Sequence, residues 1–177
     1  QREQPAIRAW QDNDPTVVET DIRVPGEGLM ILAAKVTDLG NGFWHYEYAL
    51  QNLNSDRCAG SITIPISQST IVDNIGFHDV DYHSGEPYAL EDWSNTFENN
   101  TIRWNTKTYL EDPNANALRW GTMYNFRFDA NIGPAFVPGE VVVGMFKPGG
   151  PASITVTTLV PDPTAGACNF TLLPDFC

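Results

Sequence analysis

Basic residues are scarce in this sequence. It has 10 lysines and arginines against 22 aspartates and glutamates, and its net charge is -12. Such an excess of negative charge opposes binding to nucleic acids and to anionic membrane surfaces. No apolar run approaches the roughly 20 residues that a membrane-spanning helix needs. We therefore expect no nucleic-acid partner and no membrane insertion, and we expect the carboxylates to tolerate or recruit cations.

Cysteine is also sparse, and the spacing of the three residues matches no metal-binding motif. A bridge between Cys168 and Cys177 would close a short loop, contribute about 2 to 3 kcal/mol to stability and leave Cys58 free. The alternative pairs Cys58 with one tail cysteine and leaves the other for a neighbouring chain. The cysteine usage favours export, and the start at Gln1, with no basic-then-apolar leader behind it, is typical of a processed chain.

The sequence has no recognisable catalytic motif. A Ser-His-Asp or Cys-His site needs a motif such as a nucleophile elbow, and none occurs. Carboxylate pairs for glycoside hydrolysis can be drawn from many positions, and no particular pair stands out. We therefore predict that the protein is not an enzyme.

Alternation of apolar and polar residues is the strongest structural signal. In residues 43–53, FWHYEYALQNL, the side chains at positions 44, 46, 48 and 50 are large and apolar, as on the buried face of a half-buried strand. Residues 120–129 carry a second aromatic face, which we predict to form the layer opposite the first. The predicted core aromatics are Trp44, Tyr46, Tyr48, Tyr124, Phe126 and Phe128.

Further short strands, separated by Gly- and Pro-rich turns, predict an all-β protein, an antiparallel β-sandwich of the immunoglobulin-like or jelly-roll-like kind. We expect one domain over residues 15–161, an N-terminal arm over 1–14 and a cysteine-bearing tail over 162–177. Pro65 predicts an edge strand or a bulge. Residues 84–100 are expected to be an ordered excursion, and no amphipathic helix is predicted. The other expected strands are 16–24, 29–39, 61–66, 72–82, 102–104, 140–146 and 153–160.

Four stretches carry a resemblance to a known group of proteins. They read WHYEYALQNLNSDR (44–57), NIGFHDVDYHSGEPY (74–88), NANALRWGTMYNFRFDA (114–130) and VVVGMFKPG (141–149). Together they resemble an uncharacterised domain of secreted proteins from environmental bacteria, over about residues 42–161. The resemblance implies an extracellular module and brings no activity, substrate or catalytic residue with it.

One short segment has the residue types of a cation site. If it is extended, Asp79, Asp81 and His83 share one face, where two carboxylates and an imidazole could converge on a metal such as calcium. The alternative is a polar strand end whose carboxylates cap backbone amides. Both interpretations remain open from the sequence.

Two asparagines begin an Asn-x-Thr tripeptide, the acceptor pattern for N-linked glycans. They are Asn99 and Asn169. We treat both as candidate glycan sites of an exported protein.

The N-terminal arm suggests a function. Its apolar island, Ile7, Ala9 and Trp10, is the size of a strand that could pair with an open sheet edge of the next copy. Head-to-tail donation of this kind builds a filament. We predict an extracellular or cell-surface structural subunit that polymerises with copies of itself into a filament or surface layer, and an arm that adds little to its own core.

The alternative function is a carbohydrate-binding or adhesive module without catalytic activity. An exposed, coplanar pair of tryptophans could stack on a polysaccharide. The candidates for such a pair are Trp10, Trp93 and Trp104.

Overall fold

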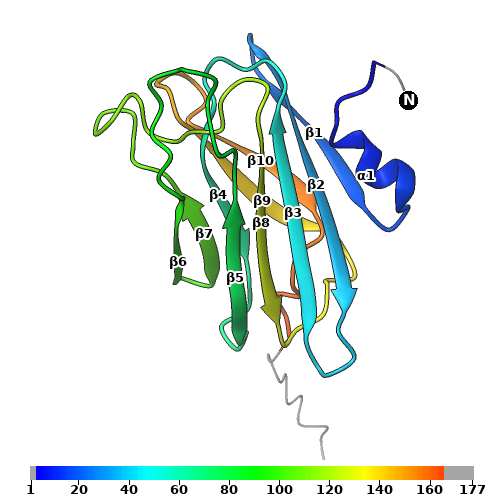
Figure 1. The fold of residues 1–177 in the computed structure, drawn as a ribbon. Coiled ribbons are helices and arrows are strands. Elements are labelled where there is room, and N and C mark those ends of the chain that lie inside the picture. Colours follow the sequence, from blue (N-terminus) through cyan, green and yellow to red (C-terminus); the bar gives the residue numbers. More distant parts are fainter. Residues whose placement is uncertain (1–2, 166–177) are drawn as a thin grey trace, which may run out of the picture.

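The computed structural model describes residues 3–165, which form two packed antiparallel sheets of five strands and one short helix (Figure 1). The predicted all-β antiparallel sandwich is thus confirmed. Within the described residues no helix is long and apolar enough to cross a membrane. The elements are α1 (Arg8–Asn13), β1 (Val18–Val24), β2 (Gly28–Asp38), β3 (Trp44–Asn52), β4 (Ala59–Pro65), β5 (Val72–His78), β6 (Ser94–Glu98), β7 (Thr101–Asn105), β8 (Met123–Ala130), β9 (Gly139–Met145) and β10 (Ser153–Thr158).

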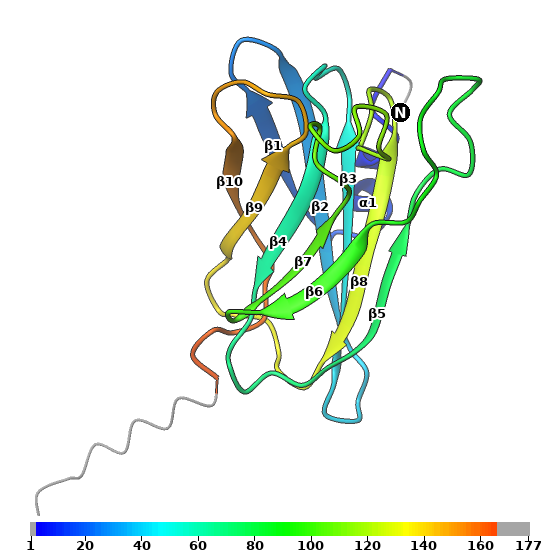
Figure 2. The same ribbon diagram turned by 90° about the vertical axis from the view of Figure 1, so that its left-hand side faces the viewer.

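The strand order explains how the chain builds the sandwich. Sheet A has the order β1-β2-β3-β8-β5, and sheet B has the order β10-β9-β4-β7-β6 (Figure 2). β1 and β10 lie side by side at one edge of the sandwich, where Thr20 Oγ1 donates to Thr157 O at 2.9 Å. At the other edge, β6 pairs only with β7 among the described strands.

The aromatic strands are neighbours in one sheet. β8 was expected opposite β3, but it pairs with β3 in sheet A and sets Tyr46 across from Phe128. Alternation fixes which side chains face inward and does not fix which sheet a strand joins, and adjacent aromatic pairs stabilise the observed arrangement. The opposing layer comes from β4, β7 and β9 of sheet B, with Ile62, Ile64, Ile102, Trp104, Val141 and Val143.

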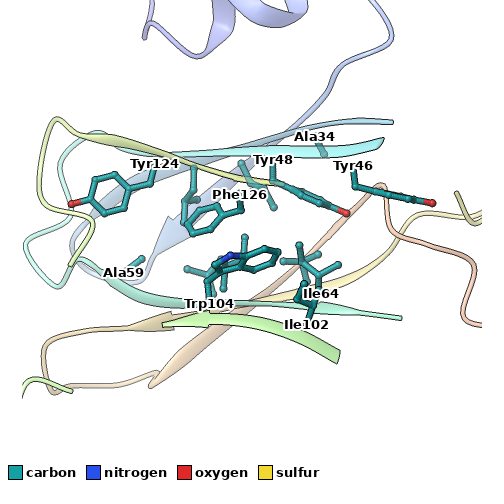
Figure 3. Close-up of a cluster of buried hydrophobic side chains, with 14 of the residues drawn as sticks. Ala34, Tyr46, Tyr48, Ala59, Ile64, Ile102, Trp104, Tyr124 and Phe126 are labelled. Atoms are coloured by element: carbon teal, nitrogen blue, oxygen red, sulfur yellow. The ribbon is translucent and has the colours of Figure 1, made fainter. Parts of the chain in front are cut away.

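These side chains form a continuous aromatic core (Figure 3). The rings of Tyr46 and Phe128 stack with their centroids 5.0 Å apart. Trp104, from the opposite sheet, lies 5.6 Å from the ring of Phe126. The Tyr46 hydroxyl donates to Ile132 O at 2.8 Å, so the buried phenol keeps a partner. Of the six predicted core aromatics, five are buried, and Trp44 is half-buried against the cluster.

One expectation about sheet B was wrong and another was incomplete. β4 is a central strand between β9 and β7; Pro65 is its last residue, and its irregularity lies at the other end, between Ala59 and Ser61. The region 84–100 contains β6. All residues of this strand are exposed, so burial imposes no alternation on its sequence. Asn99 and Asn100, both at positive φ (51° and 59°), form the tight turn into β7.

The N-terminal segment is also different from the extended arm that the sequence suggested. Residues Arg8–Asn13 form α1, which lies against the outer face of sheet A (Figure 1). Ile7, just before the helix, is buried with 1% of its surface exposed. The arm therefore packs on the sandwich instead of extending away from it.

Candidate functional site

The outer face of sheet A carries a small apolar site that holds the arm. Ile7 packs there in a cluster separate from the main core, with Trp10 half-buried at its border. The sequence contained a signal for this site: β2 is apolar on both faces, and strands of that kind are covered on both sides. We call this surface the arm-docking face, and its buried members are Val17, Ile31, Ala33 and Ala49.

Polar contacts fix the position of the arm on this face. Arg8 Nη1 lies 2.6 Å from Glu19 Oε2, and Arg8 Nη2 lies 2.5 Å from Asp21 Oδ1. The Glu19 side chain is only 3% exposed, so this pair is more shielded from solvent than an ordinary surface ion pair. The backbone N–H of Ile7 donates to Gln51 Oε1 at 3.2 Å. Each contact joins the arm to β1 or β3, so the arm is held by sheet side chains on two strands.

A short turn connects α1 to β1. Asp14 Oδ1 accepts hydrogen bonds from the backbone N–H of Thr16 at 3.0 Å and from its hydroxyl at 2.6 Å. Lys35 Nζ, on β2, lies 2.6 Å from Asp14 Oδ2. Hydrogen bonds from Lys35 and Thr16 lower the pKa of Asp14 to about 2. We call residues 14–16 the hinge, because they separate the helix from the first strand.

The residues of the predicted cation site do not converge. Asp79 Oδ2 accepts from Asn116 Nδ2, and His83 Nε2 donates to Asn116 Oδ1 at 3.2 Å. Asp81 lies exposed between them in the sequence. Within residues 3–165, no group of three or more His, Cys, Asp or Glu side chains is placed to hold a metal ion. The Asp79 carboxylate thus accepts from a side-chain amide and not from a backbone amide as the alternative expected, and calcium binding stays a prediction.

Asn116 has a buried structural role at this end of the sandwich that the sequence did not reveal. It is 1% exposed, and its Oδ1 also accepts from the Tyr124 hydroxyl at 2.6 Å. Its backbone oxygen accepts from the Trp93 indole N–H. One side chain thus satisfies buried polar atoms on the β5–β6 loop and on β8, and a loop asparagine gives no periodic signal that would reveal such a role.

A second polar cluster lies on the outer face of sheet A, away from the arm. His45 Nδ1 lies 2.6 Å from Asp129 Oδ1, and its Nε2 lies 3.2 Å from Glu47 Oε2. Asn74 Nδ2 donates to the other oxygen of Asp129 at 2.6 Å. Burial by itself would raise the pKa of Asp129, but the hydrogen bonds from Asn74 and His45 and the charge of His45 together lower it. A carboxylate held in this way links β8 to β3 and β5.

The lowered pKa of Asp129 predicts a pH-dependent contribution to stability. A carboxyl group with a depressed pKa stabilises the fold above its unfolded pKa, about 3.9, and loses that contribution as the pH falls through its folded pKa. We expect Asp129→Asn to lower the free energy of unfolding by about 1 to 2 kcal/mol at pH 7. The difference in the free energy of unfolding between the two proteins should be smaller at pH 3 than at pH 7. Urea denaturation of both proteins at the two pH values measures this difference. An equal difference at pH 3 and pH 7 would contradict the electrostatic explanation.

The candidate glycan and disulfide positions are only partly described. Asn99 is exposed at the tip of the β6–β7 turn, where its side chain is accessible to modification. Asn169, Cys168 and Cys177 lie outside the described residues. Cys58 is buried and unpaired within residues 3–165, and burial raises the pKa of its thiol. Its Sγ donates to Asp56 O at 3.2 Å, which is the behaviour of a packed, unreactive thiol.

Comparison with known proteins gives no family for this chain. No family model matches it, and no curated protein is similar to it.

Proposed function

We propose that this protein is an extracellular or cell-surface structural subunit that polymerises with copies of itself into a filament or surface layer, through its N-terminal arm. The observation that carries the proposal is the docked arm. One buried side chain, Ile7, and one doubly paired side chain, Arg8, attach a six-residue helix to a preformed site through a three-residue hinge. An element attached so simply can make the same contacts with the next copy.

The physical argument concerns the balance between the two arrangements. An arm docked on its own sheet and an arm docked on a neighbour bury the same surface and make the same ion pairs. The two arrangements differ in the conformation of the hinge and in the effective concentration of the arm near the docking face. A released helix of six residues is unstable by itself, so a free arm gains its structure only from a docking face. A high subunit concentration therefore favours exchange between copies. A hinge that does not allow the arm to fold back onto its own sheet has the same effect.

The contacts support exchange of the docked helix better than donation of a strand. To add a strand at an open edge such as β6, the arm would have to withdraw Ile7 from its cluster and unwind α1. Exchange keeps both features. Repeated in one direction, it gives an open chain of subunits unless the rotation between copies closes a ring.

The carbohydrate-binding alternative receives less support. Trp93 and Trp104 are buried at 2% and 0% exposure, and both belong to the aromatic core. Trp10 is half-buried beside the arm-docking face. The exposed pair that this alternative needs does not form from these three tryptophans.

The arm and the hinge can be tested separately. Ile7→Glu places a charge in the apolar cluster, so it should prevent docking in either arrangement and leave the protein monomeric, with the main core intact. Deleting Pro15 and Thr16 shortens the hinge, so it should hinder docking on the same chain and increase assembly. Sedimentation velocity over a range of concentrations measures both effects.

The matched control places the same charge at an exposed apolar position. Leu39, at the β2–β3 turn, is 44% exposed, and Leu39→Glu should assemble like the unmodified protein. The proposal fails if Ile7→Glu and Leu39→Glu assemble equally, or if the shortened hinge gives monomers.

A further inference from the structure

The outer face of sheet B carries an apolar groove close to the point where the described chain ends. Pro65, Val142, Val160 and Pro163 form its apolar walls. A second hollow shares Pro65 and Pro163 with it and continues to Ala165, the last described residue. In Figure 2 this last segment, coloured orange, lies at the same end of the sheet as the β6–β7 turn. The two hollows therefore adjoin and form one short track at this end of sheet B.

We infer that this groove is the docking site of the chain's own C-terminal tail, residues 166–177. The track begins where the tail begins: Ser69 Oγ donates to Ala165 O at 2.9 Å and fixes the start of the tail at the end of the groove. The inference does not depend on the proposed function, because the arm docks on the outer face of the other sheet.

The length of the tail fits this site. Its twelve residues reach roughly 40 Å when extended, at 3.3 to 3.6 Å per residue. The seven residues of β4 span only roughly 23 Å. The tail is therefore long enough to cover the groove, and its attachment at Ala165 gives it a high effective concentration there.

The chemistry of the tail also fits. Its sequence, GACNFTLLPDFC, carries four large apolar side chains in a chain that is otherwise strongly acidic. Phe170 and Leu172 fall on one face if this stretch is extended, so they can enter an apolar groove together. Asp175 is the one charged residue of the tail.

An exposed arginine lies beside the groove. Arg103 is exposed on β7, next to Thr63 in the sheet, and Thr63 lines the groove. Arg103 has no ion pair among the described residues. Glu140, on β9, lines the groove on the other side of β4. The groove is thus flanked by one positive and one negative side chain.

Backbone amide spectra of the full-length protein test the inference. We compare the unmodified chain with Phe170→Ser/Leu172→Ser and with the conservative control Thr171→Ser. Loss of docking should shift the amide resonances of Thr63, Thr101 and Val142, while the control leaves them in place. If the double variant moves no groove resonance, the inference is overturned.

The reciprocal change tests the groove side. Val142→Lys should increase the fast mobility of the Leu172 and Leu173 amides, measured by heteronuclear NOE. Thr37→Lys adds the same charge at an exposed position of sheet A and should not affect them. Equal effects of the two variants would overturn the inference. Dilution identifies the source of the tail. Groove resonances that do not change with protein concentration support docking of the chain's own tail. Resonances that change with concentration would assign the groove to a neighbour's tail and contradict the inference.

Discussion

Phe126→Ala is expected to lower the free energy of unfolding by about 3 to 5 kcal/mol, the usual cost of truncating a large buried aromatic. Phe126 is fully buried and contacts rings from both sheets: its centroid lies 5.5 Å from Phe77 and 5.4 Å from Trp93, as well as close to Trp104. The cavity would open at the centre of the sandwich, where neighbouring rings cannot close it without moving both layers.

Phe136 provides the matched control for this change, because it is fully exposed in the loop after β8. Phe136→Ala should alter the free energy of unfolding by no more than about 0.5 kcal/mol. Chemical denaturation of the two variants measures the difference. A loss below about 1 kcal/mol for Phe126→Ala would mean that the inward face of β8 is wrongly assigned.

Asn116→Ala is expected to cost about 3 kcal/mol, a larger effect than most polar substitutions produce. The change removes a partner of three groups at once: the Asp79 carboxylate, the His83 ring and the Tyr124 hydroxyl, which keeps Ala117 O at 3.2 Å. Each buried polar group left without a partner costs about 1 to 3 kcal/mol, reduced where water can enter the space.

The control for this change is Asn114→Ala, two residues earlier and exposed. Its side chain is not part of the Asn116 network, so its substitution should have little effect. Thermal unfolding of the two variants and of the unmodified protein, with and without calcium, tests both the Asn116 network and the predicted cation site. Similar losses in stability for the two variants would contradict the network. A calcium-dependent rise in the melting temperature of the unmodified protein would support the predicted cation site.

The sequence predicted the sandwich well, because alternation in β1, β3 and β8 reports burial directly. It failed where burial gives no alternation. β6 is exposed along its whole length and is defined only by its pairing with β7. The pairing of β8 with β3 could not be predicted either, since Phe126 and Phe128 face the core equally well from either sheet.

The arm was missed for a different reason. A helix of six residues is too short to show a period of 3.6, and α1 has no side-chain cap to mark its start. Its stability comes from tertiary contacts of Ile7 and Arg8, which no local pattern contains. The predicted metal residues show the same limit, because Asp79 and His83 are joined through Asn116, far along the chain.

The most direct test of the central claim is a complementation experiment with two assembly-defective chains. Ile7→Glu gives a chain with a defective arm and an intact docking face. Ala49→Glu gives a chain with an intact arm and a defective face, since Ala49 is 2% exposed within the apolar cluster. Light scattering measures the molar mass of each chain alone and of their equimolar mixture. If the arm acts between copies, each chain alone is monomeric and the mixture forms one-to-one dimers; a mixture that stays monomeric would contradict assembly through the arm.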